Sequence, residues 1–158
     1  MKVLIPGSFD PPTLGHLDII NRSIAIFDKV LIGVVTNPSK EAMFSSKDRI
    51  EMLVENIDLT KNSSVEVKNF EGLLVNFAKN EKVDVIVKGV RAMTDFDYEF
   101  QMAQVNKELD GLETLFVTAK PEYGYVSSSL VKEIFILGGD VSSFVSQNVL
   151  EKLNEESK

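Results

Sequence analysis

The sequence predicts an α/β protein in which five strands alternate with helices in a single domain. The chain has 158 residues, enough for one domain with a full hydrophobic core. Short, nearly continuous apolar runs recur along it, and such runs are typical of strands covered on both faces. Segments with a helical spacing of apolar residues separate the runs. Strands and helices in this alternation form a parallel, doubly wound, Rossmann-like sheet.

The first three elements follow from their apolar residues. Residues 2–6 contain the run Val-Leu-Ile and predict a strand. Residues 14–27 predict a helix, because one helical face would carry Leu17, Ile20, Ile24 and Phe27. Residues 29–36 predict a second strand, since six consecutive residues within them are apolar or glycine.

The middle of the chain repeats the alternation. A serine at 45 or 46 can cap a helix that runs to about Ile57. Val65 and Val67 mark a third strand by their alternation with charged residues. A short helix at 72–81 and a buried strand at 83–87 follow.

The last third adds four elements. Residues 95–109 predict a helix with Asp95 as its cap, and residues 115–117 predict the fifth strand. A helix at 127–137 should end at Gly138-Gly139, because glycine readily takes the backbone conformation that closes a helix. A polar-faced helix at 146–156 completes the chain.

Composition excludes several classes of protein. The chain has 17 basic and 24 acidic residues, a net charge of −7, which disfavours non-specific binding of nucleic acid. No apolar run approaches the roughly 20 residues that span a bilayer, and the start does not resemble a signal peptide. The absence of cysteine excludes disulfides and thiolate chemistry and fits a cytoplasmic location.

Residues 7–16, Gly-Ser-Phe-Asp-Pro-Pro-Thr-Leu-Gly-His, are the most informative stretch. They connect the first strand to the first helix, so the helix N-terminus would present free backbone N–H groups, which bind phosphate well. His16, the only histidine in the chain, stands in the first turn of that helix. The stretch therefore indicates a nucleotide, with chemistry at a phosphorus atom.

Further polar residues follow the other predicted strands, where ligands bind in doubly wound sheets. Lys40 follows the second strand, and Lys88, Gly89 and Arg91 follow the fourth. Lys88 and Arg91 can bind phosphate, and Gly89 would let a ligand approach the backbone. Three serines, Ser127–Ser129, begin a later helix and can form a second anion site.

The motifs resemble one enzyme family. Thr13-Leu14-Gly15-His16 matches the T/H-x-G-H signature of the nucleotidyltransferase superfamily. Segment 88–101 resembles the R-G-[LV]-R-x-x-x-D-[FY]-[DE]-Y-E segment of bacterial phosphopantetheine adenylyltransferases, with Lys88 where that family usually has arginine. Segment 125–133 is similar to the superfamily's I-S-S-[ST]-x-[IV]-[RK]-E motif, and Glu71–Leu74 resembles the family's pantetheine-binding loop. The resemblance covers nearly the whole chain.

The resemblance implies that AMP is transferred from ATP to 4′-phosphopantetheine, which yields dephospho-coenzyme A and pyrophosphate. The acceptor phosphate is already ionised at pH 7, so alignment and charge stabilisation suffice for a direct in-line displacement. The resemblance also implies Mg²⁺ bound mainly through the ATP phosphates, with no protein metal site, coenzyme A as a further ligand, and a homohexamer.

The resemblance assigns the site residues in three groups. The catalytic residues are His16, Lys40 and Arg91. The phosphopantetheine-binding residues are Ser8, Lys40, Leu74, Lys88 and Asn106. The ATP-binding residues are Ser8, Phe9, His16, Gly89, Val90, Arg91, Glu99, Tyr123, Gly124, Tyr125, Val126, Ser127, Ser128 and Ser129. Asp10 is expected to support the loop in which the signature begins.

Three alternatives stay open. A sister enzyme could transfer AMP or CMP to another phosphate, such as nicotinamide mononucleotide or glycerol phosphate, although Leu73-Leu74 and segment 88–99 favour phosphopantetheine. A non-catalytic nucleotide-binding module is disfavoured by the intact signature. A fragment of an aminoacyl-tRNA synthetase ranks last, because the chain is short and acidic.

Overall fold

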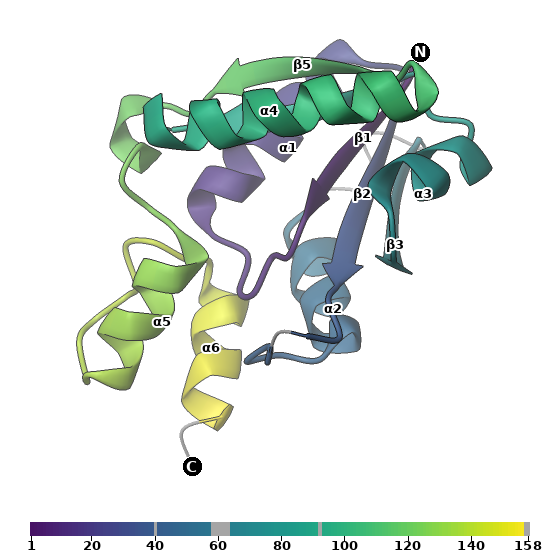
Figure 1. Ribbon diagram of the computed structural model, residues 1–158. Coiled ribbons are helices and arrows are strands. Elements are labelled where there is room, and N and C mark those ends of the chain that lie inside the picture. Colours follow the sequence, from purple (N-terminus) through teal and green to yellow (C-terminus); the bar gives the residue numbers. More distant parts are fainter. Residues whose placement is uncertain (40, 58–63, 92, 157–158) are drawn as a thin grey trace.

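The protein is built on one parallel sheet of five strands (Figure 1). The computed structural model describes residues 1–39, 41–57, 64–91 and 93–156. The strands run in the order β3-β2-β1-β4-β5, and their bounds are Lys2–Gly7 (β1), Lys29–Thr36 (β2), Val65–Glu71 (β3), Val85–Val90 (β4) and Glu113–Thr118 (β5). From β1 the chain adds β2 and β3 on one side, then crosses back and adds β4 and β5 on the other side of β1. This order confirms the predicted doubly wound sheet.

Helices cover both faces of the sheet, and two further helices lie beyond the carboxyl ends of the strands (Figure 1). Their bounds are Leu14–Ile26 (α1), Ser46–Asn56 (α2), Leu74–Asn80 (α3), Met93–Asp110 (α4), Pro121–Tyr123 (η1, a single 3₁₀ turn), Ser128–Ile136 (α5) and Gln147–Glu156 (α6). None of the helices in the described ranges is long and apolar enough to cross a membrane.

Successive side chains of β1 point to opposite faces of the sheet, and their contacts show which helices cover each face. Val3 and Ile5 are fully or nearly fully buried among side chains of α1 and α2, including Leu17 and Leu53. Leu4 points to the opposite face and packs in a separate cluster with Ala78 of α3. A strand with both faces covered must be apolar at consecutive positions, which is why β1 and β2 read as continuous apolar runs.

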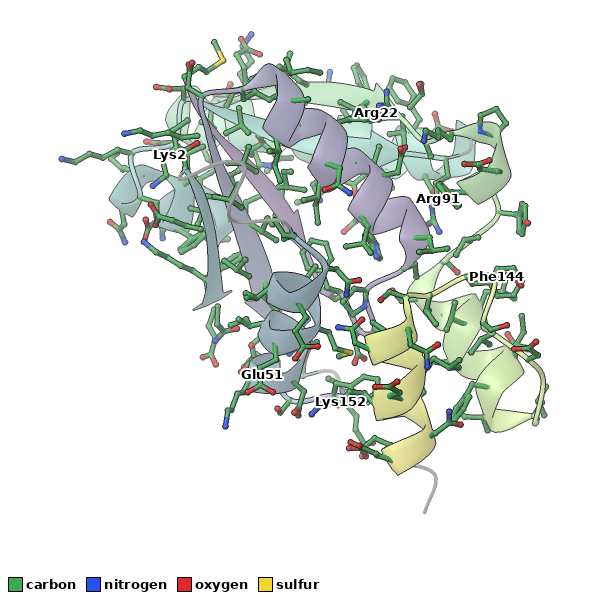
Figure 2. The ribbon with its side chains drawn as sticks, turned by 180° about the vertical axis from the view of Figure 1, so that it is seen from behind. Lys2, Arg22, Glu51, Arg91, Phe144 and Lys152 are labelled. Atoms are coloured by element: carbon green, nitrogen blue, oxygen red, sulfur yellow. The ribbon has the colours of Figure 1, made fainter. Side chains whose placement is uncertain are left out.

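A third apolar cluster lies away from the sheet. It joins Val131 of α5 and Leu153 of α6 to Phe44 and to Met52 of α2. Figure 1 shows α5 and α6 beyond the carboxyl ends of the strands, towards which the strand arrows point. Ion pairs join α6 to α2 as well, and Figure 2 shows Lys152 near Glu51 (Nζ–Oε2 3.9 Å). The two C-terminal helices therefore form a wall beyond the strand ends.

Strands β1 and β4 separate towards their carboxyl ends. β1 pairs with β2 along its whole length, but it pairs with β4 only at Val3↔Val85 and Leu4↔Ile86. β4 instead continues beside β5 as far as Val90↔Thr118. The space between the two diverging strands lies at the switch point of the sheet, where ligands bind in this architecture.

Most predicted elements form, with shifted ends. The fourth strand extends to Val90 rather than ending at residue 87, so Lys88, Gly89 and Val90 lie within β4, because β5 pairs with them. The fourth helix begins at Met93, so Asp95 lies in its first turn and is not its cap. The third helix is shorter than predicted, at Leu74–Asn80, and η1 was not predicted. Ser45 caps α2, one of the two serines predicted to do so, and Ser127, predicted as the first residue of a helix, is the cap of α5.

Candidate active site

A cavity of about 450 Å³ opens between the diverging ends of β1 and β4. It is lined by the β1–α1 loop, the start of α1, the end of β4, one turn of α4 and the start of α5. Its lining residues are Ile5, Pro6, Gly7, Ser8, Phe9, Thr13, Gly15, His16, Ile19, Val35, Val87, Lys88, Gly89, Arg91, Glu99, Ala119, Val126, Ser127, Ser128 and Ser129. Twelve of these residues are polar or glycine and belong to the predicted motifs. The strand ends therefore bring together motifs from distant parts of the chain.

The loop after β1 is held in place by Asp10. Its buried carboxylate accepts hydrogen bonds from the backbone N–H groups of Met43 (3.0 Å) and Phe44 (2.9 Å). Lys132 of α5 donates to the same carboxylate at 2.9 Å. Burial raises the pKa of Asp10, but these hydrogen bonds outweigh it and hold the pKa below its ordinary value. An ionised Asp10 thus ties the loop to the backbone at Met43 and Phe44 and to α5.

His16 is locked to the N-terminus of α1 by a reciprocal cap. The Thr13 side chain accepts a bond from the His16 backbone N–H (3.4 Å), while His16 Nδ1 accepts one from the Thr13 backbone N–H (3.0 Å). A nitrogen that accepts carries no proton, so the proton of the neutral ring is on Nε2. Nε2–H makes no hydrogen bond with a described residue and is the donor that His16 can offer to the cavity.

The His16 ring stays neutral well below pH 7. Desolvation by the surrounding atoms and repulsion from the nearby Arg91 guanidinium lower its pKa from 6.5 to about 4. At neutral pH the ring can therefore donate a hydrogen bond but carries no charge. It is suited to polarise an anionic oxygen, and it is not suited to supply a proton from an imidazolium.

The two cations of the cavity are both paired with carboxylates on α4. Lys88 Nζ lies 3.1 Å from Glu99 Oε2, and both side chains are about four-fifths buried. Arg91 Nε lies 2.9 Å from Asp95 Oδ2, and Arg91 Nη1 donates to the Val126 carbonyl at 2.7 Å. Figure 2 shows Arg91 near the start of α1, between the sheet and the α5–α6 wall. The sequence predicted that both cations follow the fourth strand, whereas Lys88 lies within β4, and it did not indicate their carboxylate partners.

The three serines at the start of α5 have different neighbours. Ser127 caps the helix by accepting from the Leu130 N–H (3.1 Å), and the Ser128 hydroxyl donates to the Pro11 carbonyl (2.8 Å). All three serines line the cavity. The helix N-terminus thus faces the cavity, and Ser128 also fastens it to the β1–α1 loop.

The sequence suggested that Gly89 makes room for a ligand, but the nearest group to its missing side chain is Ile19. A Cβ added there would lie 3.0 Å from Cγ1 of Ile19 on α1. The missing side chain therefore makes room for a helix packed against the sheet, although the residue also lines the cavity. A Cβ added at Gly15 would lie 3.4 Å from Cβ of Tyr123, an ordinary contact, so this glycine is not required for the packing of η1 against α1.

One predicted site residue, Lys40, lies outside the described residues. Six others do not line the cavity. Those away from the cavity are Leu74, Val90, Asn106, Tyr123, Gly124 and Tyr125. Tyr125 is largely exposed, with its ring edge-on to Phe144 at 6.2 Å. Leu74 packs in the core cluster beneath α3.

Asn106 stands on α4 two turns beyond Glu99. Seven residues correspond to about 10 Å along a helix and nearly the same face. Asn106 is only 6% exposed, yet its side-chain amide makes no hydrogen bond with another described residue. Among the described residues only the Thr114 hydroxyl is a fully buried polar group without a partner, so the Asn106 amide still reaches solvent and can hydrogen-bond to a ligand.

Sequence reasoning missed Arg49, which is buried near the cavity. Its Nη1 donates to the carbonyls of Ser8 (2.8 Å) and Val35 (3.0 Å), two residues that line the cavity. Arg49 thereby joins the ends of β1 and β2. An arginine in the first turn of a helix is usually exposed, so the pattern offered no signal for this contact.

Known proteins resemble this chain over its whole length. The family model described as cytidylyltransferase-like matches residues 4–134. A phosphopantetheine adenylyltransferase from Caldanaerobacter subterraneus subsp. tengcongensis is 52% identical, covering 100% of this chain and 99% of the relative. One from Clostridium perfringens is 46% identical, covering 95% of this chain and 91% of the relative.

Solved structures share the fold at low sequence identity. A protein from Vibrio parahaemolyticus, provisionally described as a nicotinate-nucleotide adenylyltransferase, superposes with a TM-score of 0.68 at 22% identity, covering 98% of this chain and 93% of the other. A lipopolysaccharide core biosynthesis protein from Thermoplasma volcanium gives 0.53 at 20% identity, with coverages of 76% and 96%. The fold, the position of the cavity and the close relatives agree, and the chain belongs to the phosphopantetheine adenylyltransferase family of nucleotidyltransferases.

Proposed function

We propose that this protein transfers AMP from ATP to 4′-phosphopantetheine and so forms dephospho-coenzyme A and pyrophosphate, a step of coenzyme A biosynthesis. The observation that carries the proposal is the neutral His16 imidazole, whose Nε2–H is free at the wall of a cavity that also holds Lys88 and Arg91. The relatives named above, at 46–52% identity, bear that enzyme's name.

The chemistry needs no nucleophile from the protein. An ionised acceptor phosphate attacks the α-phosphorus of ATP, the bond to the β-phosphate oxygen breaks, and pyrophosphate leaves. His16 Nε2–H donates to an α-phosphate oxygen, on which negative charge accumulates in the transition state. Arg91 and the α5 N-terminus at Ser127–Ser129 hold the leaving phosphates. Catalysis then comes from alignment and charge stabilisation.

Lys88, the other cation that lines the cavity, is assigned to the phosphate of the acceptor. Lys88 can move its ammonium from Glu99 to the acceptor phosphate with little change of position, and Ser8 and Lys40 are assigned to the same phosphate. The unpaired amide of Asn106, two turns along α4, suits an amide of the pantetheine arm, and Leu74 belongs to the same side. An acceptor whose phosphate binds at Lys88 must extend along α4 to reach Asn106. Phosphopantetheine is long enough for this, and glycerol phosphate is not.

Magnesium would be held by the substrate. No group of three or more potential metal ligands converges among the residues that the structure describes. The cavity contributes hydrogen-bond donors and cations, which suit phosphate oxygens and not a divalent cation. We propose that Mg²⁺ accompanies ATP, bound by phosphate oxygens and water, where it neutralises phosphate charge.

We further propose a cytoplasmic homohexamer that can also bind coenzyme A, the end product built from its own product. ATP, its substrate, is a cytoplasmic nucleotide. An assembly has a suitable surface, because α4 and the edge strand β5 expose apolar side chains: Tyr98, Val105, Leu109 and Leu115. Light scattering after size exclusion measures the mass, and a monomeric mass at micromolar concentration would contradict the hexamer.

A coupled pyrophosphate assay tests the function. ATP is supplied with 4′-phosphopantetheine, nicotinamide mononucleotide or glycerol phosphate, and the nucleotide product is identified by mass spectrometry. We expect pyrophosphate release with 4′-phosphopantetheine and dephospho-coenzyme A as the product. Faster release with another acceptor would favour a sister enzyme, and release with none of them would contradict the proposed reaction.

A further inference from the structure

Phe9 has a backbone conformation that is unfavourable for its residue type. Its φ angle is 48°, in the left-handed region that bulky L-residues rarely occupy. Its side chain is nevertheless 2% exposed and lines the cavity from below. Unfavourable backbone conformations of this kind concentrate at functional sites, where the surrounding contacts hold them.

Gly7 provides the space that the Phe9 ring fills. A Cβ added at Gly7 would lie 2.9 Å from Phe9 Cζ and 3.0 Å from Cε2. Carbon atoms do not approach this closely, so any other residue at position 7 would displace the ring. The left-handed turn at residue 9 folds the ring back onto the last residue of β1.

The Phe9 ring in turn contacts the imidazole of His16. The two ring centroids are 5.1 Å apart and the planes meet at 74°, an edge-to-face arrangement. Thr13 already holds Nδ1 of the same imidazole through its backbone N–H. The ring of His16 is therefore held at one nitrogen by the loop backbone and on a second side by an aromatic ring from the same loop.

We infer that Phe9, seated on Gly7, is a positioning residue that fixes the orientation of the His16 imidazole with Nε2 towards the cavity. Thr13 alone fixes one atom of the imidazole, about which the ring could still tilt. The Phe9 ring removes that freedom, because a rigid aromatic edge or face allows few orientations of its neighbour. The inference rests on the proposed role of His16, but its central measurement is independent of activity.

The chain offers a matched control for this pair. Gly33 of β2 lies beneath Phe70 of β3, and a Cβ there would lie 3.0 Å from Phe70 Cε1. Phe70 is 7% exposed and stacks on Phe77 at 4.4 Å. Neither Gly33 nor Phe70 lines the cavity. Gly33→Ala and Phe70→Leu therefore disturb a glycine–aromatic contact of the same kind without touching His16.

The test uses Phe9→Leu and Gly7→Ala beside the two control variants. Since His16 is the only histidine, ¹⁵N-histidine labelling gives one pair of ring nitrogen signals, which report the ratio of the two neutral tautomers. We expect the wild type and both controls to show the Nε2–H tautomer. Phe9→Leu and Gly7→Ala should shift and broaden these nitrogen signals, because the ring can then tilt about the Nδ1 bond to Thr13, and kcat should fall about 10- to 100-fold as the donor loses its orientation.

The outcomes separate the inference from the proposed function. If Phe9→Leu keeps both the wild-type nitrogen signals and the wild-type kcat, or if the controls shift His16 equally, the inference is wrong. If the signals change while kcat does not, Phe9 does position His16, and the proposed catalytic role of His16 fails. Should Gly7→Ala not fold, Phe9→Leu, the milder change, decides alone.

Discussion

His16 should make the stability of this protein fall as the pH is lowered from about 6.5 to 4. The pKa of this ring is about 4 in the folded protein and near 6.5 in an unfolded chain, because folding buries it beside Arg91. Between those pH values the unfolded chain binds a proton that the folded protein does not. Unfolding is then favoured by each step towards acid.

The size of the effect follows from the two pKa values. At pH 5 the unfolded histidine is mostly protonated and the folded one mostly neutral. Relative to pH 8 this shifts the folding equilibrium by roughly 30-fold, which lowers the free energy of unfolding by at most about 2 kcal/mol. The figure is an upper value, because the ring is partly exposed at the cavity wall.

Urea unfolding at pH 8, 6.5 and 5 measures this dependence in the wild type and in His16→Gln, which cannot titrate. Carboxylates such as Asp10, whose pKa is lowered on folding, lose their stabilising effect nearer pH 4 in both proteins. The difference between the two proteins therefore isolates His16. An NMR titration of the single histidine with a midpoint near 6.5, or equal pH dependence in both proteins, would refute the reasoning.

Three further predictions concern the reaction. His16→Ala should lower kcat by about 10²–10³ with a smaller effect on ATP affinity, as for the loss of one transition-state donor, and wild-type turnover of a folded variant would contradict this. Lys88→Ala should raise KM for 4′-phosphopantetheine more than KM for ATP, and Arg91→Ala should do the reverse; the opposite pattern in steady-state kinetics would mean that the two phosphate subsites are exchanged. Transfer should invert the configuration at the α-phosphorus, which chirally labelled α-thio-ATP reports, whereas net retention or a competent protein–AMP adduct would show that a residue of the protein attacks first.

Local sequence signals predicted the parts of the fold that local interactions determine. The apolar runs of β1 and β2 and the serine cap of α2 each depend on neighbouring residues. The loop between β1 and α1 was predicted for the same reason, since a strand, a glycine and a helix start follow one another in the sequence. The predicted doubly wound sheet is confirmed, because the alternation of strands and helices allows few topologies.

Contacts between distant segments could not be predicted in this way. The end of β4 was placed too early, because Lys88, Gly89 and Val90 become strand only through pairing with β5, and Asp95 was taken for a cap that the helix does not use. The Asp10–Lys132 ion pair joins residues 122 positions apart. No local pattern reports which carboxylate a lysine will meet when the chain folds.

The pairing of both cavity cations with carboxylates fits a site for two highly charged substrates. Lys88 and Arg91 line the same cavity, where unpaired positive charges would repel each other. Glu99 and Asp95, both on α4, neutralise them before a substrate arrives. A phosphate at Lys88 must therefore compete with the Glu99 carboxylate, so binding there gains less from charge alone and depends more on the position of the phosphate. Lysine suits this exchange, because a single ammonium can turn from Glu99 to phosphate by rotating its side chain, whereas an arginine fork would have to break two parallel hydrogen bonds.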